Sequence, residues 1–295
     1  MNRENTMIHA DAQTYLQSPA KRVLLFGMSG LGKTRLSSLL REAGTWFHYS
    51  VDYRIGTRYM NEFIADNFKR EAMKVPLLRD LLMTDSVYIA SNITFDNLAP
   101  LSTYLGKPGD PAKGGLPFAE YLRRQSQHRD AEVAAMRDTV RFIDRAQDIY
   151  GYPNFVCDSS GSICEVVDAA NPADPTMQAL SQNLLLVWIK GTPDHRADLI
   201  RRFDRAPKPM YYRPEFLAQV WQEFLAANDV TEAQVNPDAF LRYGYARLLE
   251  HRQPRYEAMA TWGVTVTADE VAQVRSATDV DSLIAAALER RAATA

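Results

Sequence analysis

A glycine-rich loop between an apolar run and a helical pattern constrains this chain more than any other feature. Residues 27–34 read Gly-Met-Ser-Gly-Leu-Gly-Lys-Thr, which fits the phosphate-binding pattern G-x-x-x-x-G-K-S/T. The apolar run 23–26 precedes the loop, and Leu36, Leu39 and Leu40 follow it at helical spacing. A strand that turns into a helix in this way points backbone N–H groups at an anion. The loop therefore predicts a site for a nucleoside triphosphate.

Each position of the loop has an expected role in that site. The glycines Gly27, Gly30 and Gly32 let the backbone wrap a phosphate without clashes from Cβ atoms. Lys33 is expected to reach the β- and γ-phosphates during transfer, and the Thr34 hydroxyl to ligate Mg²⁺. The full set expected to bind nucleotide in this segment is Gly27, Met28, Ser29, Gly30, Leu31, Gly32, Lys33, Thr34 and Arg35. ATP and Mg²⁺ are the cofactors that this reading predicts, and a glycine-rich turn without a ligand is the alternative.

The composition is that of an ordinary water-soluble protein. The 295 residues carry a formal net charge of −2, which gives no reason to expect a nucleic-acid or membrane-surface partner. The first twenty residues are polar and lack the apolar core of a signal peptide, so we expect residues 1–20 to be a flexible arm. With only Cys157 and Cys164, a structural disulfide is not expected. We expect a cytoplasmic protein with no membrane contact.

Five short β-type runs predict the architecture. They are residues 22–26, 46–51, 154–157, 184–189 and 263–266. Helical patterns separate them, and near-continuous apolar character, as in 184–189, is typical of strands covered on both faces. We therefore predict an α/β chain with the three-layer P-loop NTPase fold, built on a five-stranded parallel sheet.

The spacing of the runs predicts where the chain departs from a simple crossover pattern. About a hundred residues separate the second run from the third, so residues 53–153 are expected to form a mostly helical insertion in a core that spans 21–295. Its clearest helical pattern covers 117–149, as one helix or two. A second enlargement, 191–253, is expected to hold a lid.

Two carboxylates are expected at the edge of the sheet where ligands bind in open α/β folds. Asp52 follows the second run and could align or deprotonate an acceptor hydroxyl, or hold Mg²⁺ through water; it could also cap the next helix. Asp158 ends the third run, as the Mg²⁺-associated Walker B carboxylate does, and we expect it to act with Thr34. The alternative is that Asp158 starts the turn that contains Gly161, which is either a substrate-binding turn or a structural elbow.

A cationic segment follows the fourth run. Between residues 196 and 213, two aspartates stand against six basic residues, Arg196, Arg201, Arg202, Arg205, Lys208 and Arg213. Phosphoryl-transfer enzymes place arginines on a lid to neutralise charge on the transferring group. We favour this interpretation over a solvated helix face.

These residues together resemble the shikimate kinases and related P-loop small-molecule kinases. The resemblance covers the phosphate loop, Asp52, Gly161, the stretch 213–217 and the stretch 252–260. It implies that Asp52 and the Gly161 turn lie at the acceptor and that Arg252 binds an anionic group of it. It also implies that Arg202 or Arg205 lies near the nucleotide and that Arg213 bridges nucleotide and acceptor.

The chain departs from this family at three points. Ser50 stands where the family has the first aspartate of Asp-x-Asp, Ser-Ser-Gly replaces the triple glycine that ends at position 161, and the insertion 53–153 has no counterpart. The likeness therefore covers about half of the chain and leaves the acceptor unidentified.

The leading hypothesis is an ATP- and Mg²⁺-dependent phosphotransferase acting on a polar, anionic small molecule. The alternative is an ATPase or nucleotide-dependent switch whose insertion binds a protein partner. Residues 53–152 contain fourteen Lys or Arg against thirteen Asp or Glu, which argues against a nucleic-acid partner. A third hypothesis is a kinase of nucleotides or nucleic-acid ends, in which Tyr211, Tyr212 and Trp221 would stack a base.

Overall fold

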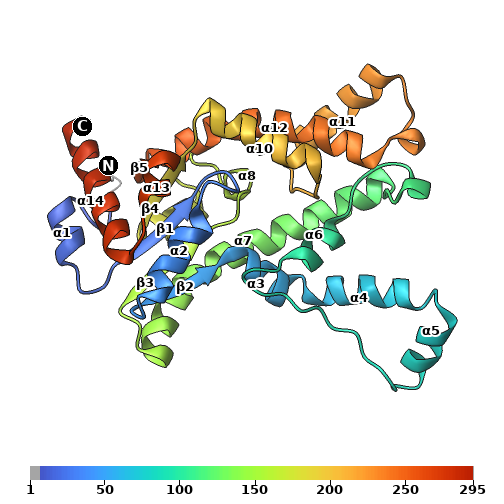
Figure 1. The fold of residues 1–295 in the computed structure, drawn as a ribbon, viewed down its shortest axis with the longest axis horizontal. Coiled ribbons are helices and arrows are strands. Elements are labelled where there is room, and N and C mark those ends of the chain that lie inside the picture. Colours follow the sequence, from blue (N-terminus) through green and yellow to red (C-terminus); the bar gives the residue numbers. More distant parts are fainter. Residues whose placement is uncertain (1–6, 295) are drawn as a thin grey trace. The chain divides into compact units, whose positions relative to one another are not determined.

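A five-stranded, all-parallel sheet organises the computed structural model, which describes residues 7–294 (Figure 1). The strands lie in the order β2-β3-β1-β4-β5. Their bounds are β1 (Arg22–Phe26), β2 (Trp46–Ser50), β3 (Asn154–Asp158), β4 (Leu185–Lys190) and β5 (Val264–Thr267). All five predicted strands are present, with ends that differ from the prediction by no more than one residue.

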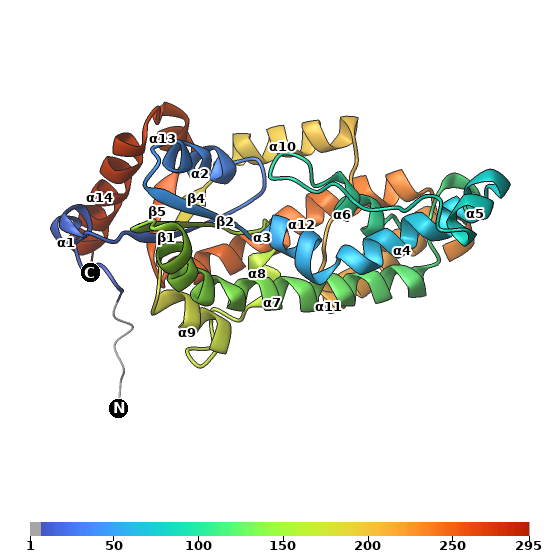
Figure 2. The same cartoon turned by 90° about the horizontal axis from the view of Figure 1, so that it is seen from below.

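Helices cover both faces of the sheet. Figure 2 shows α2 (Lys33–Glu42) and α13 (Ala268–Gln273) on one side of the strands, and α9 (Pro175–Ser181) with the end of α7 (Phe118–Tyr150) on the other. Because both faces are covered, the central strand β1 is buried from Val23 to Phe26. This arrangement confirms the predicted three-layer α/β fold.

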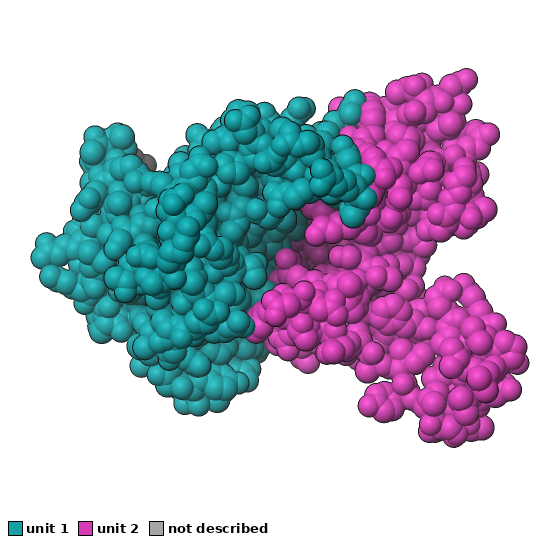
Figure 3. Space-filling view, viewed as in Figure 1, with its two compact units in different colours: residues 1–51, 133–206, 245–295 teal, residues 52–132, 207–244 magenta. Residues whose placement is uncertain are grey.

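The chain divides into two compact units, coloured teal and magenta in Figure 3. Unit 1 combines the residues up to Val51 with Val133–Ala206 and the residues from Tyr245 onward. It holds the sheet and also α1 (Ala12–Gln17), α8 (Ile163–Val166), α10 (Pro193–Arg205) and α14 (Ala277–Thr294).

Unit 2 consists of Asp52–Glu132 and Pro207–Gly244. It holds most of α3 (Val51–Arg54), then α4 (Asn61–Ala72), α5 (Pro76–Met83), α6 (Ala99–Leu105) and α11 (Pro214–Asn228), with short π and 3₁₀ turns at Ile55–Tyr59, Pro111–Lys113 and Glu232–Gln234. The expected insertion 53–153 supplies the first part of this unit, and the expected lid region 191–253 is split, with α10 in unit 1 and α11 in unit 2.

Two long helices, α7 and α12 (Pro237–Ala260), have residues in both units. The span predicted as one helix or two is the single helix α7, and its second half belongs to unit 1 because it packs on the sheet: the Tyr49 hydroxyl donates to the Ala135 carbonyl at 2.7 Å. The other is α12, which belongs to unit 1 from Tyr245 onward.

The N-terminal segment is more ordered than the predicted flexible arm. Residues 1–6 lie outside the described part, but α1 begins after an Asp11 cap, and Tyr15 is fully buried with its hydroxyl 2.8 Å from the Asp281 carboxylate on α14. Burial of this ring holds the segment, which sequence polarity alone did not indicate. Among residues 7–294, no helix combines the length and the apolar character needed to cross a membrane.

The aromatic residues proposed for base stacking form part of the core of unit 2. Trp221 is fully buried and stacks on Phe118 with ring centroids 4.4 Å apart, and Tyr211 and Tyr212 are buried as well. The faces of these rings are therefore covered by protein, and this structure gives no support to the predicted stacking role.

Candidate active site

The phosphate loop joins β1 to α2 with the backbone geometry that its glycines allow. Gly27, Gly30 and Gly32 have φ angles of 142°, 89° and 105°, a region that residues with a side chain rarely adopt. A Cβ atom at Gly27 would also lie 2.6 Å from the carbonyl oxygen of Ile189 on β4. The loop thus follows a path that leaves its backbone open at the N-terminus of α2.

Lys33 lies along this loop. Its Nζ donates to the carbonyl oxygens of Gly27 at 2.8 Å and Met28 at 3.2 Å, and the residue is only 6% exposed. Ser29, Gly30 and Thr34 are exposed beside it. The buried positive charge of Lys33 therefore lies against the loop, and the exposed residues of the loop are accessible to a phosphate chain.

Arg35 faces away from this arrangement. Its guanidinium donates to the Val271 carbonyl at 2.7 Å and to the Val274 carbonyl, so it ties α2 to the end of α13. The predicted nucleotide contact of Arg35 gains no support, because its donors serve packing within unit 1.

Asp158 ends β3 and lies beside β1 and β2. In the register of the sheet it pairs with Leu25 and Ser50, and its carboxylate lies 3.8 Å from His48 Nε2. The residue is 6% exposed. A carboxylate and, on α2, an exposed Thr34 hydroxyl offer the oxygen ligands that Mg²⁺ prefers.

Asp52 and Arg213 belong to unit 2. β2 ends at Ser50, so Asp52 lies in the first turn of α3, where it is partly exposed. Arg213 directly precedes α11 and is also partly exposed. Their roles at the acceptor stay predictions.

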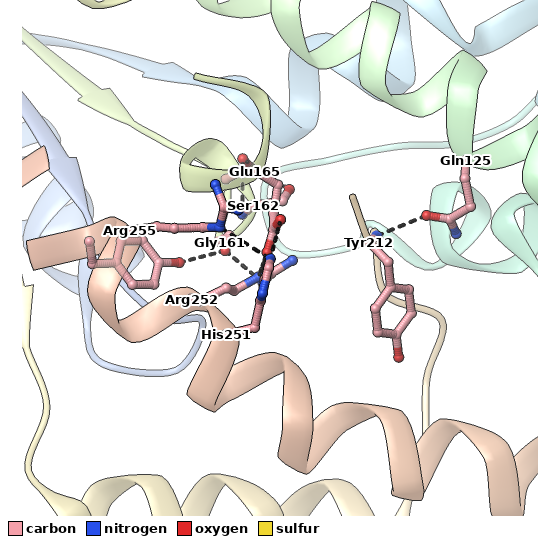
Figure 4. Close-up of polar contacts among 10 residues, drawn as sticks. Gln125, Gly161, Ser162, Glu165, Tyr212, His251, Arg252 and Arg255 are labelled. Carbon is pink, nitrogen blue, oxygen red and sulfur yellow. Dashed lines mark hydrogen bonds and ion pairs between the residues drawn. The ribbon is translucent and has the colours of Figure 1, made fainter. Parts of the chain in front are cut away.

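Gly161 lies between the phosphate loop and α12. A Cβ atom at Gly161 would be 2.2 Å from the Ser29 hydroxyl oxygen, so this turn touches the loop directly. On its other side, the Gly161 carbonyl accepts from Arg252 Nη1 at 2.7 Å and from the Tyr256 hydroxyl at 2.6 Å (Figure 4). α12 therefore holds the turn against the loop.

Arg252 is paired inside unit 1. It is 2% exposed, and its Nε donates to the Glu165 carboxylate at 3.1 Å, while His251 Nε2 lies 3.4 Å from the same carboxylate (Figure 4). Burial alone would raise the pKa of Glu165, but hydrogen bonding from His251 and the charge of Arg252 lower it below its ordinary value. Burial likewise opposes the charge of Arg252, yet Glu165 raises its pKa.

This pairing differs from the role that the resemblance implied for Arg252. An arginine that binds the acceptor would present its guanidinium to a cavity, whereas two of its donors here bind Glu165 and Gly161. The sequence did not indicate this because Glu165 lies 87 positions away along the chain. These two bonds hold Arg252 against the Gly161 turn, and the role predicted for it at the acceptor gains no support from them.

Helix α10 brings an arginine to the phosphate loop. Leu199 is buried, and its Cδ2 atom would lie 2.9 Å from a Cβ atom at Gly30; Arg202 Nη2 would lie 3.9 Å from the same point. Phe203 fixes the helix by stacking on Tyr245, with centroids 3.8 Å apart. Arg202 thus lies near the loop, while Arg205, also exposed, ends the helix. The predicted nucleotide contact of either arginine stays a prediction.

A pocket of about 240 Å³ lies beside the loop within unit 1. Met28 and Leu31 form one wall, and the segment after β4 forms the other. The complete lining is Met28, Leu31, Lys190, Gly191, Thr192, Pro193, His195, Arg196, Leu199 and Gln253. Apolar walls with polar groups at the rim suit a flat heterocycle.

A larger cavity, of about 1010 Å³, lies within unit 2. Three lysines line it. Lys107 binds Asp238 at 2.5 Å and Lys113 lies 3.2 Å from Asp110, whereas Lys208 forms no ion pair with any residue from 7 to 294. Asp96 and Asn97 also line it. This lining mixes apolar residues with polar and charged ones, and its lysines could bind an anionic group.

Comparison with known proteins gives a structural likeness. No family model matches the chain, and no match was found among the curated proteins. The chain is similar to the crystal structure of shikimate kinase from Bacteroides thetaiotaomicron, with 16% identity, a TM-score of 0.36, and coverage of 93% of this chain and 97% of that chain.

The fold itself rests on the sheet and the loop. Five parallel strands, with the glycine loop between β1 and the start of α2, form a P-loop kinase-like fold. The predicted three-layer α/β fold with its five-stranded parallel sheet is therefore confirmed.

The sequence missed several residues around the loop. Tyr256 and Glu165 gave no local signal because they act through partners on distant segments. His48 is buried, and its place beside Asp158 follows only from strand pairing. Leu199, which lines the pocket, could have been predicted as a buried residue from the helical spacing of the apolar residues in α10.

Proposed function

We propose that this chain is an ATP- and Mg²⁺-dependent phosphotransferase. The observation that carries the proposal is the phosphate loop with a buried lysine along it and the Arg202 guanidinium beside Gly30. These groups suit a triphosphate, and the adjacent pocket of about 240 Å³ suits the base of the same nucleotide.

The site residues of unit 1 have separate roles in phosphoryl transfer. Backbone N–H groups of the loop and Lys33 bind the β- and γ-phosphates, and Arg202 neutralises charge that develops on the transferring group. Thr34 and Asp158 would hold Mg²⁺, which would supply positive charge to offset the negative charge of the phosphates. Gly27 and Gly30 keep the cradle free of side chains.

The acceptor is assigned to unit 2. Asp52 would align its hydroxyl for attack, and Arg213 would contact its anionic group or the phosphates. Since Arg252 is paired with Glu165, the anion of the acceptor needs another cation, and the lysine-lined cavity supplies Lys208. We therefore favour a polar, anionic small molecule as the acceptor.

Transfer of radiolabel from γ-labelled ATP to a panel of hydroxylated metabolites tests this function. We expect a labelled product with at least one anionic member, and a loss of about 100-fold or more in Lys33→Ala. Lys74→Ala is the matched control, because Lys74 is exposed and pairs only with its neighbour Glu71 on the surface of unit 2. Turnover of ATP that is equally fast with water alone would reject the kinase.

A nucleotide-dependent switch is the second candidate, because α12 contacts Gly161 in unit 1 and begins in unit 2. A change at the phosphate loop could thus act on a helix that both units share. Capture of a protein partner that differs between ATP analogue and ADP, without any labelled metabolite, would favour the switch.

A further inference from the structure

Strand β5 lies at one edge of the sheet. It is the last strand in the order β2-β3-β1-β4-β5, and among residues 7–294 it pairs only with β4. The backbone N–H and C=O groups on its other side therefore face away from the sheet. A free edge of this kind is a template to which a strand of another chain can bind.

Two arginines of α14 bind the carbonyl groups on this free side. Arg291 Nη1 donates to the carbonyl of Gly263, directly before β5, and Arg291 Nη2 donates to the Thr261 carbonyl at 3.2 Å. Arg290 Nη2 donates to the Thr265 carbonyl at 3.3 Å. Alternate residues of a strand direct their carbonyls to the same side, so the bound carbonyls of Gly263 and Thr265 both belong to the edge that faces away from β4. The arginines thus occupy acceptors that an added strand would need.

Glu270 binds the next N–H group along the same side. One oxygen of its carboxylate accepts from the Thr267 N–H at 2.7 Å, and the other lies 3.0 Å from Arg290 Nη1. The ion pair therefore joins α13 and α14, the two helices beside β5 (Figure 1). Because both side chains are partly exposed, the pair itself contributes little to stability. Its main effect is to hold both side chains over the edge of the strand.

These side chains lie where an added strand would have to lie. A groove of about 630 Å³ follows the edge of β5, and Glu270, Arg290 and Arg291 line it together with residues of β5 itself. A strand that joins a sheet lies about 4.8 Å from its neighbour. The three side chains must therefore leave the groove before a strand can pair there.

We propose that Glu270, Arg290 and Arg291 form a clamp that keeps β5 from pairing with β5 of a second copy of this chain. Two copies related by a two-fold axis could join their sheets through antiparallel β5 strands, if the outward groups of these strands were free. The clamp binds those groups within the chain. The proposal does not depend on the proposed function, because no clamp residue belongs to the phosphate loop or to the pocket beside it.

Sedimentation velocity over a concentration series tests the clamp on the full chain. In Arg290→Ala combined with Arg291→Ala, we expect a species of twice the wild-type mass at a concentration roughly 10-fold or more below any at which the wild type forms it. Lys69→Ala combined with Lys74→Ala is the matched control. It also removes two positive charges, but from exposed side chains of unit 2 that pair with nearby acidic residues. The control should keep the wild-type mass.

Thr265→Pro, added to the double variant, distinguishes strand pairing from aggregation of a loosened chain. Proline removes the N–H of position 265, which lies on the free side of β5, and proline is tolerated on edge strands. We expect the triple variant to return to the wild-type mass. Far-ultraviolet circular dichroism establishes that the variants are folded. If the double variant is unfolded, Arg290→Ala alone gives the same test, because it leaves the bonds of Arg291 in place.

Three results would overturn the proposal. The first is a folded clamp variant that keeps the wild-type mass up to about 100 µM, because an exposed edge would then not lead to pairing. The second is an association that Thr265→Pro leaves unchanged, since it would use another surface. The third is an equal association of the lysine control, which would assign the effect to the loss of charge.

Discussion

The Ser29 hydroxyl occupies the space that a side chain at position 161 would need, so only glycine fits there without a shift of its neighbours. A Cβ atom at Gly161 would lie 2.2 Å from the Ser29 hydroxyl oxygen and 3.2 Å from the Ser29 nitrogen. The turn cannot retreat freely, because Arg252 and Tyr256 bind its carbonyl from the other side. The shape of the phosphate loop therefore depends on a glycine more than a hundred residues away.

Replacement of this glycine should weaken nucleotide binding. Gly161→Ala overpacks the contact with Ser29, at a cost of about 1–3 kcal/mol, so we expect roughly a 10-fold loss of ATP affinity in calorimetry. Gly244→Ala is the control: it lies within α12 in unit 2, and the nearest atom to its Cβ would be the Tyr212 hydroxyl at 3.3 Å. Unchanged affinity in Gly161→Ala would contradict the coupling.

Asp158 should govern the dependence on magnesium. In Asp158→Asn we expect ATP to bind about equally with and without Mg²⁺, and the wild type to gain roughly 10- to 100-fold affinity from the ion. The substitution keeps the volume of the side chain and removes its charge. If Asp158→Asn retains the full gain from Mg²⁺, the carboxylate has only a structural role beside His48.

Arg202 should contribute to turnover and Arg201 should not. Arg202 lies near Gly30, whereas the neighbouring Arg201 is exposed and pairs with Asp198 on the same helix. We expect Arg202→Ala to lower the maximal rate of ATP turnover by about 100-fold, because it removes one cation from the phosphates. Arg201→Ala serves as the control, and equal effects of the two substitutions would indicate a general effect of helix charge.

Removal of one member of the buried Glu165–Arg252 pair should lower the free energy of unfolding strongly, whereas replacement of both by apolar residues should lower it little. Glu165→Gln leaves a buried guanidinium without its carboxylate, so we expect a loss of about 3–5 kcal/mol in the free energy of unfolding by urea. The double variant Glu165→Leu with Arg252→Met should recover most of it. A double variant as unstable as Glu165→Gln would show that the hydrogen bond to Gly161, and not the charge, dominates.

The same pair should make stability depend on pH in the acid range. The pKa of Glu165 is below its ordinary value of 4.5 in the folded protein, so its contribution is complete above that value and is lost as pH falls through the lower folded pKa. We expect the wild type to lose stability as the pH falls below about 4.5, and Glu165→Gln to lose less. Parallel curves for the two proteins, measured by urea unfolding, would contradict this assignment.

Local patterns were sufficient for much of the fold. The strands β1 and β3 were predicted because continuous apolar runs bounded by turns describe buried parallel strands. The loop was predicted because three glycines at fixed spacing can adopt positive φ angles before a helix. Both signals arise within a few residues, so one sequence is enough to read them.

The roles of single side chains were harder to predict from the sequence. Arg35 and Arg252 were both expected to bind ligand, and both instead bind groups of this chain, 236 and 87 positions away. A charged residue has the same local pattern whether it meets a ligand, a carboxylate or a carbonyl. Only the packing of distant segments decides among them.

The sequence by itself thus determined an α/β fold with a glycine-rich loop between its first strand and the next helix, since glycine spacing and apolar runs are properties of neighbouring residues. The tertiary structure decided how that site is supported: Gly161 against Ser29, Arg252 against Glu165, and Arg202 beside Gly30. It also decided that Asp52 and Arg213 belong to unit 2. The physical reason is that these contacts form between segments whose approach is driven by burial of the core, which no local pattern records.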